Sequence, residues 1–250
     1  MRKLLIPFLL FFVFLASCKK ETTTIPDMVS GQNFYPAQIG KYIVYNCDST
    51  IYDDFTATTT VHSGTLRYLV TDTFRNSGNQ LSYTVSVQYM PKDSTEYMQN
   101  DVIAVTPTSG QVVVVEKNIS FIKMVFPVSN NKSWNGNALI PIDDLDPTFA
   151  EFNDNAWNYT YANFDTDFQP STKLYNHTVT INEINDTLNN PDIDSSAYAF
   201  KNYKQEIYGY NVGLVYRERT YWVFQPKVDG SGGSGYRSGY SVVMKAIDNN

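Results

Sequence analysis

The chain has 250 residues and a formal net charge of −6, from 19 basic and 25 acidic side chains. Binding to a phosphate backbone needs a positive field, so this charge argues against nucleic acid as a partner. A chain of this length can bury a sizeable apolar core in one large domain or two small ones.

The first residues of the chain are typical of a signal peptide. Arg2 and Lys3 precede an uncharged apolar run from Leu4 to Leu15. A run of this length suits the hydrophobic core of a signal peptide but is too short to cross a ~30 Å hydrocarbon layer, which needs about 20 residues. We therefore expect residues 1–17 to be removed, and the loss of two basic residues takes the formal charge from −6 to −8.

Leu15-Ala16-Ser17-Cys18 follows the apolar run. It resembles the lipobox of bacterial lipoproteins, in which small residues precede a cysteine that is lipidated. The resemblance implies that a signal peptidase recognises Leu15, Ala16 and Ser17, and that the Cys18 thiolate takes diacylglycerol, with palmitate among its acyl chains. Two or three chains anchor a protein stably to a membrane. An ordinary cleavable signal peptide is the alternative.

Residues 18–33 are polar and lack periodicity, so we expect a flexible tether ahead of a single extracytoplasmic β domain over residues 34–250. The Ser-Cys-Lys-Lys-Glu start and the body rich in Tyr, Asn and Thr look like uncharacterised lipoproteins of the Bacteroidota. That resemblance implies lipid anchorage in the outer membrane. It leaves open whether the domain faces the cell surface or the periplasm.

A two-residue period dominates the rest of the chain. Leu81, Tyr83, Val85, Val87 and Tyr89 alternate with small polar residues, which is typical of a half-buried antiparallel strand. Residues 74–80 hold a turn and residues 65–73 are rich in β-formers, so the sequence predicts a hairpin here.

Eight further strands are expected, at 41–51, 96–105, 111–117, 119–126, 157–164, 178–184, 213–224 and 240–246. The one helical signal is Asp146 followed by Pro147, which suits the first turn of a short helix over 146–151. About ten antiparallel strands with little helix predict an all-β domain. It would be a sandwich or a strongly curved, half-barrel-like sheet.

Three segments carry a second resemblance. Residues 34–45, with Pro36 and Gly40 ahead of an aromatic run, resemble the opening of many secreted lipoproteins, and residues 126–134 and 210–218 fit the same loose pattern. Some such proteins look similar to LolA-like half-barrel carriers, which hold acyl chains on the concave face of a sheet. The resemblance implies a fold that handles lipids or lipoproteins.

Asp followed by Ser or Thr and then Thr or an aliphatic residue is the pattern of O-glycosylation in Bacteroidota proteins. Three segments match it, which makes Ser49, Ser94 and Thr187 candidate modification sites. Peptide mass spectrometry of the native protein tests each of them.

No catalytic, metal or cofactor motif is recognisable. Neither His62 nor His177 has another plausible ligand near it in the sequence at the spacing of a metal site. If Cys18 is lipidated, Cys47 is alone, and its strand-like surroundings predict a buried structural thiol. We therefore expect no cofactor, no metal and no enzyme, although a glycosidase-type carboxylate pair is a third possibility.

Aromatic residues are abundant, with 19 Tyr, 15 Phe and 3 Trp. They fill and rim a β core, or they form a platform for sugars or proteins; the clusters around Trp157 and Trp222 are the candidates. The leading hypothesis is a membrane-anchored domain that binds a glycan, a peptide or a partner protein. A lipid- or lipoprotein-handling half-barrel is the alternative.

Overall fold

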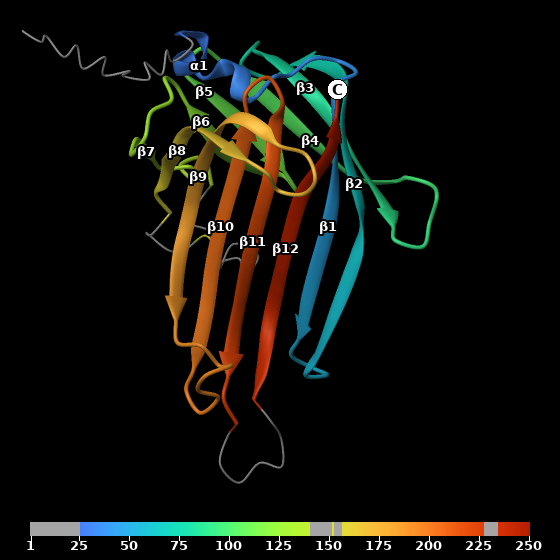
Figure 1. Ribbon diagram of the computed structural model, residues 1–250, viewed down its shortest axis with the longest axis vertical. Helices are drawn as coiled ribbons and strands as arrows, with labels where there is room; N and C mark the ends of the chain where they lie inside the picture. The colour runs from blue at the N-terminus through green and yellow to red at the C-terminus, as the bar shows by residue number, and fades with distance from the viewer. Residues whose placement is uncertain (1–25, 141–151, 153–156, 228–234) are drawn as a thin grey trace, which may run out of the picture.

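The computed structural model describes residues 26–140, 152, 157–227 and 235–250, and they form one antiparallel sheet (Figure 1). The order of its strands is β6-β5-β4-β3-β2-β1-β12-β11-β10-β9-β8-β7. Two meanders, β1–β6 and β7–β12, are thus joined where the first and last strands pair. The strand bounds are β1 Tyr42–Asp53, β2 Thr58–Arg75, β3 Leu81–Pro91, β4 Met98–Pro107, β5 Gln111–Glu116, β6 Ile119–Val125, β7 Ser133–Trp134, β8 Tyr159–Phe168, β9 Tyr175–Leu188, β10 Ala199–Gly209, β11 Gly213–Gln225 and β12 Tyr236–Asn249.

The sheet is strongly curved and nearly closed. Its two outer strands approach each other, because Trp134 of β7 donates its indole N–H to the carbonyl of Ile122 in β6 at 2.7 Å. Ile122 in turn donates its backbone N–H to Gly136 at 2.8 Å. The curved alternative of the predicted fold class is therefore confirmed, and the sandwich alternative is wrong.

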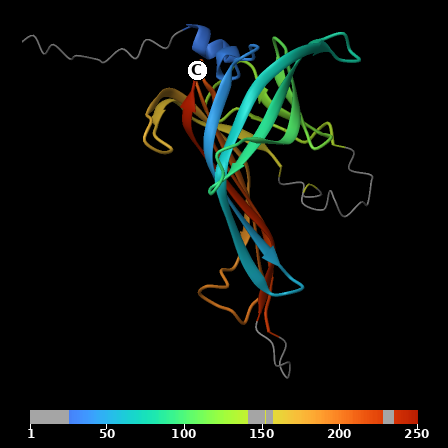
Figure 2. The ribbon, with the colours of Figure 1, turned by 90° about the vertical axis from the view of Figure 1, so that its right-hand side faces the viewer.

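The strands differ in length, which gives the molecule an upper and a lower part. The long strands β1, β2 and β9–β12 run down together into the lower part (Figures 1 and 2). The shorter β4, β5 and β6 cross over the upper part of the long strands, where most of the core is buried.

The predicted hairpin over 65–73 and 81–89 is confirmed as β2 and β3, and the eight further predicted strands overlap β1, β4–β6, β8, β9, β11 and β12. Two strands were missed, so the described residues hold twelve strands and not about ten. β7 has only two residues. β10 was missed because its inward positions include Lys204 and Glu206, which break the apolar alternation of an ordinary half-buried strand.

The start of the chain also differs from the prediction. Residues 26–33, expected within the tether 18–33, hold the short helix α1 (Pro26–Ser30) and most of η1 (Gln32–Phe34). Met28 and Phe34 are fully buried, and the Phe34 ring packs edge-on against Phe164 and Tyr210. The folded domain thus begins before residue 34.

Two further points concern helices. No helix in the described part of the chain combines the length and apolar character needed to cross a membrane. The helix predicted over 146–151 lies outside the described residues.

Gly239 of β12 tests the close pairing of the long strands. Its φ is +132°, and an added Cβ would lie 2.2 Å from the backbone oxygen of Tyr221. We expect Gly239→Ala to lower the free energy of unfolding by about 2 kcal/mol or more in urea titrations. Gly110 has nothing within 4 Å of an added Cβ, so Gly110→Ala is the matched control and should change stability by less than about 0.5 kcal/mol. Equal effects would contradict this account.

Candidate functional site

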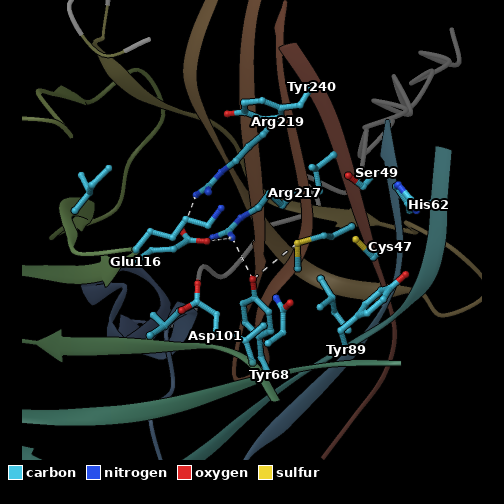
Figure 3. Close-up of a pocket in the computed structure, with 18 of the residues that line it drawn as sticks. Cys47, Ser49, His62, Tyr68, Tyr89, Asp101, Glu116, Arg217, Arg219 and Tyr240 are labelled. Atoms are coloured by element: carbon cyan, nitrogen blue, oxygen red, sulfur yellow. Dashed lines mark hydrogen bonds and ion pairs between the residues drawn. The ribbon is translucent and has the colours of Figure 1, made fainter. Parts of the chain in front are cut away.

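The inner face of the sheet holds an open cavity of about 630 Å³ (Figure 3). Residues of β1–β6, of the turn between β5 and β6, and of β11 and β12 line it, together with Phe152. Apolar side chains make up much of these walls: Ile51, Leu66, Val87, Ile103, Val242 and Met244. The cavity therefore offers a largely apolar surface that is open to solvent and includes some polar side chains, such as His62 and Asp101.

The strand period explains how the walls arise. Successive side chains of a strand point to opposite faces, so every second residue faces the cavity. Cys47, Ser49 and Ile51 of β1 line the cavity in this way. Their neighbour Thr50 has no place in the lining and belongs to the outer face.

One end of the cavity is polar. Arg217 and Arg219 reach it from β11, and Glu116 reaches it from β5 (Figure 3). Glu116 accepts a hydrogen bond from Arg217 Nη1 at 3.1 Å on Oε1 and one from Arg219 Nη2 at 3.0 Å on Oε2. The hydroxyl of Tyr68 accepts a further, 3.3 Å bond from Arg217.

Behind this end, Glu206 of β10 is fully buried. Its Oε1 accepts hydrogen bonds from Arg217 Nε at 2.8 Å and from Lys123 Nζ at 3.0 Å, and its Oε2 accepts one from the Tyr208 hydroxyl at 2.6 Å. Lys123 also pairs with Glu183. These ion pairs join β5 and β6 to β9–β11 across the interior, and we call their members the interior ion-pair network: Glu116, Lys123, Glu183, Glu206, Arg217 and Arg219.

The network is balanced, with three carboxylates and three cations. Burial alone would raise the pKa of Glu116, but Arg217 and Arg219 outweigh burial and bring this pKa down to about 2. Burial likewise opposes ionisation of Glu206, and the cations Arg217, Lys123 and Arg219 hold its pKa well below the usual range. Both carboxyl groups are therefore ionised at neutral pH, and neither holds a proton for general acid catalysis.

Arg219 keeps unused donors at the cavity. Its side chain is 19% exposed. The hydrogen bonds that it donates within the described residues all leave from Nη2, and Nε is buried without a partner in that part of the chain. A guanidinium carries five N–H groups, so this end of the cavity can still donate to an acceptor atom of a ligand.

Of the titratable residues singled out in the sequence, Cys47 and His62 both line the cavity, whereas His177 does not. Cys47 is buried as predicted and free, and burial raises the pKa of its thiol to about 11. His62 lies exposed at the cavity, whereas His177 of β9 lies 2.6 Å from Asp165. Within the described ranges, no three His, Cys, Asp or Glu side chains gather as metal ligands would.

The candidate modification sites are also separate. Ser49 is half-buried in the cavity, Ser94 lies in the turn between β3 and β4, and Thr187 is exposed on β9. These three remain predictions. Leu15, Ala16, Ser17 and Cys18 lie outside the described residues.

The aromatic cluster around Trp157 is part of the core. Trp157 is 4% exposed, and Tyr159 and Tyr161 are fully buried. The core-filling interpretation therefore holds for this cluster. Tyr208, which precedes Trp222 in the other aromatic cluster, is also buried and donates a hydrogen bond to Glu206.

Sequence reasoning missed every member of the interior ion-pair network. A signal was present, since Arg217 and Arg219 occupy alternate positions of the predicted strand 213–224 and therefore share a face. Nothing in the sequence says that this face is the buried one. The partners are also far apart in the sequence: Glu116 lies 101 positions from Arg217, and Lys123 lies 83 positions from Glu206.

No family model and no curated protein matches the chain. Among solved structures, a Bacteroides fragilis protein inferred to be exported, with a YmcC-like fold, is similar at a TM-score of 0.36 and 13% sequence identity. The similarity covers 86% of this chain and 99% of that one. A similarity of this size shows neither a shared family nor a shared function.

The depressed pKa of Glu116 predicts acid lability. Its folded-state value of about 2 lies below the ordinary 4.5, so its ionisation stabilises the fold above about pH 4.5 and this contribution disappears as the pH falls towards 2. The contribution is about 3 kcal/mol at neutral pH. We expect the free energy of unfolding, from urea titrations between pH 7 and 3, to fall less steeply on acidification in Glu116→Gln than in the wild type.

Glu96→Gln is the control, because Glu96 is exposed in a turn and its carboxylate is not in the network. It should keep the wild-type pH dependence. Parallel curves for the wild type and Glu116→Gln would show that Glu116 titrates normally and would contradict the network.

Proposed function

We propose that the interior cavity binds a single-chain amphiphile, such as a fatty acid or another lipid with one acyl chain. The chain lies along the apolar walls, and the head group accepts hydrogen bonds from Arg219. The observation that carries this proposal is the cavity of about 630 Å³, largely apolar along its walls and polar at the end formed by Arg217, Arg219 and Glu116.

The size and lining of the cavity suit such a ligand. Small-molecule sites commonly measure 300–1,000 Å³, with apolar walls and a few polar groups that fix orientation. Each buried methylene contributes about 0.8 kcal/mol, so an acyl chain binds mainly through its length. The head group then sets the direction in which the chain enters.

The other functions expected from the sequence fit this cavity less well. A glycan needs many polar partners along its whole length, whereas aliphatic and aromatic side chains make up the larger part of this lining. A glycosidase needs one protonated carboxyl group, whereas Glu116 and Glu206 are held ionised by their cationic neighbours. The lipid-handling alternative is therefore the one that we propose for this site.

We also propose that the protein works at a membrane through lipid on Cys18. Helix α1 lies at the upper end of the molecule, opposite the turn between β1 and β2 (Figure 1). An anchor ahead of α1 places the upper end nearest the membrane and directs the long strands away from it. Outer-membrane anchorage, at the cell surface or the periplasmic face, is part of this proposal.

A fluorescent fatty acid tests the cavity. We expect 11-(dansylamino)undecanoic acid to gain fluorescence with the chain produced without residues 1–17 and carrying Cys18→Ser. Ser49→Phe places a ring in the cavity and should abolish the gain. Arg219→Gln removes the donor at the polar end and should weaken binding about fivefold, which corresponds to about 1 kcal/mol.

Thr50→Phe is the matched control, since the neighbouring position of β1 lies on the outer face; it should bind the probe as the wild type does. Thermal unfolding of each variant shows whether it is folded. No fluorescence gain with the wild type, or equal binding by Ser49→Phe and Thr50→Phe, would contradict the proposal.

Mass spectrometry of the native protein tests the processing. We expect an amino-terminal peptide that begins at acylated Cys18, and a glycopeptide containing Ser94, which lies in the connection between β3 and β4. The Cys18→Ala variant should lose the lipid and leave the membrane fraction without detergent. A native protein that begins at Met1, or peptides unmodified at Ser49, Ser94 and Thr187, would refute the anchor and the glycosylation respectively.

A further inference from the structure

A second hollow, of about 510 Å³, lies on the outer face of the sheet, in the lower part of the molecule. Five neighbouring strands, β9, β10, β11, β12 and β1, each contribute one residue to a row of directly paired positions across the sheet. In that order the residues are Thr187, Lys201, Trp222, Gly239 and Tyr52. Gly239 has no side chain, so this position of the row adds nothing between Trp222 and Tyr52.

Two cations lie on this floor, held by aromatic rings. The Arg237 guanidinium lies 5.0 Å from the ring centre of Trp222 and 5.8 Å from that of Tyr52. The Lys201 ammonium lies 5.0 Å from the ring centre of Tyr203. Cation–π contacts fix the position of a cation without neutralising its charge.

The protein itself supplies one carboxylate to this floor. Asp192, in the connection between β9 and β10, accepts a 2.8 Å hydrogen bond from Arg237 Nη2. The Asp192 side chain is 74% exposed, and within the described residues no ion pair joins Lys201 to a carboxylate. The lining therefore carries one net positive charge in a chain whose formal charge is −6.

The remaining lining is polar and neutral. Asn185 and Thr187 project from β9, and Asn189 and Asn190 follow in the connection to β10. Side-chain amides and hydroxyls both donate and accept hydrogen bonds, which is the chemistry that sugar hydroxyls require. The inner cavity differs in this respect, because the larger part of its lining is aliphatic or aromatic.

From this combination we propose that the outer hollow binds a saccharide that carries a carboxylate. The carboxylate lies between Lys201 and the Arg237 groups that Asp192 does not use. The sugar hydroxyls meet the amide of Asn185, the side-chain oxygen of Asn189 and the side-chain nitrogen of Asn190. The Asn189 nitrogen and the Asn190 oxygen are bonded to the backbone of Tyr198 and Asp192. This site lies on the opposite face from the amphiphile cavity, and it stands or falls independently of that proposal.

Affinity electrophoresis provides the test, with polygalacturonate as the probe and neutral dextran as the comparison. The protein is the chain without residues 1–17, carrying Cys18→Ser and produced in a host without O-glycosylation. We expect native gels containing polygalacturonate to retard it, and gels containing dextran to leave its mobility unchanged. A net negative protein has no general attraction to a polyanion, so retardation requires a local site.

Lys201→Gln should raise the apparent dissociation constant at least fivefold, and Asn185→Ala should raise it without any change of charge. Lys92→Gln is the matched control: it removes the same charge from an exposed turn outside the hollow, and it should bind as the wild type does. Mobility in gels without polysaccharide normalises each variant. No retardation by polygalacturonate, or equal retardation of Lys201→Gln and Lys92→Gln, would overturn the proposal.

Discussion

The ion pairs buried inside the curved sheet are the constraint on which the rest of the structure depends. Glu206 receives Lys123 from β6 and Arg217 from its neighbour β11, so the strand at one end of the sheet order meets two strands of the other meander at one carboxylate. Burying these charges is costly, and they remain buried only because each finds partners at hydrogen-bond distance. A sheet that curled less, or that slipped by one residue, would leave a charge unpaired. The network therefore favours one curvature and one register over the alternatives.

Charged side chains lie on both faces of the sheet. On the inner face, Arg217, Arg219 and Glu116 form the polar end of a cavity whose remaining lining is largely aliphatic and aromatic. On the outer face of the same strands, Lys201 and Arg237 lie on aromatic rings among amides and hydroxyls. The strand period of two separates these chemistries, since neighbouring residues point in opposite directions. One sheet can thus present an apolar site and a polar site without either reaching the other.

Local patterns made much of the fold predictable, and long-range pairing made the sites unpredictable. The alternation from Leu81 to Tyr89 was enough to place β3 and its hairpin partner. β10 was not predicted because Lys204 and Glu206 face inwards, whereas hydrophobic patterning assigns such residues to the surface. The packing of Met28 and Phe34 was missed for a similar reason, because a short polar segment shows no period that would reveal two buried anchors. The outer hollow depends on a register across five strands that no single segment encodes.

A double-mutant cycle between Glu116 and Arg219 tests the network most directly. The two side chains come from β5 and β11 and meet at 3.0 Å, across the interior of the sheet. Urea titrations of the wild type, Glu116→Gln, Arg219→Gln and the double variant at pH 7 give their coupling energy. This account predicts a favourable coupling of about 1 kcal/mol or more. Stability changes that add to within about 0.3 kcal/mol would contradict it, because residues in contact through a buried ion pair cannot act independently.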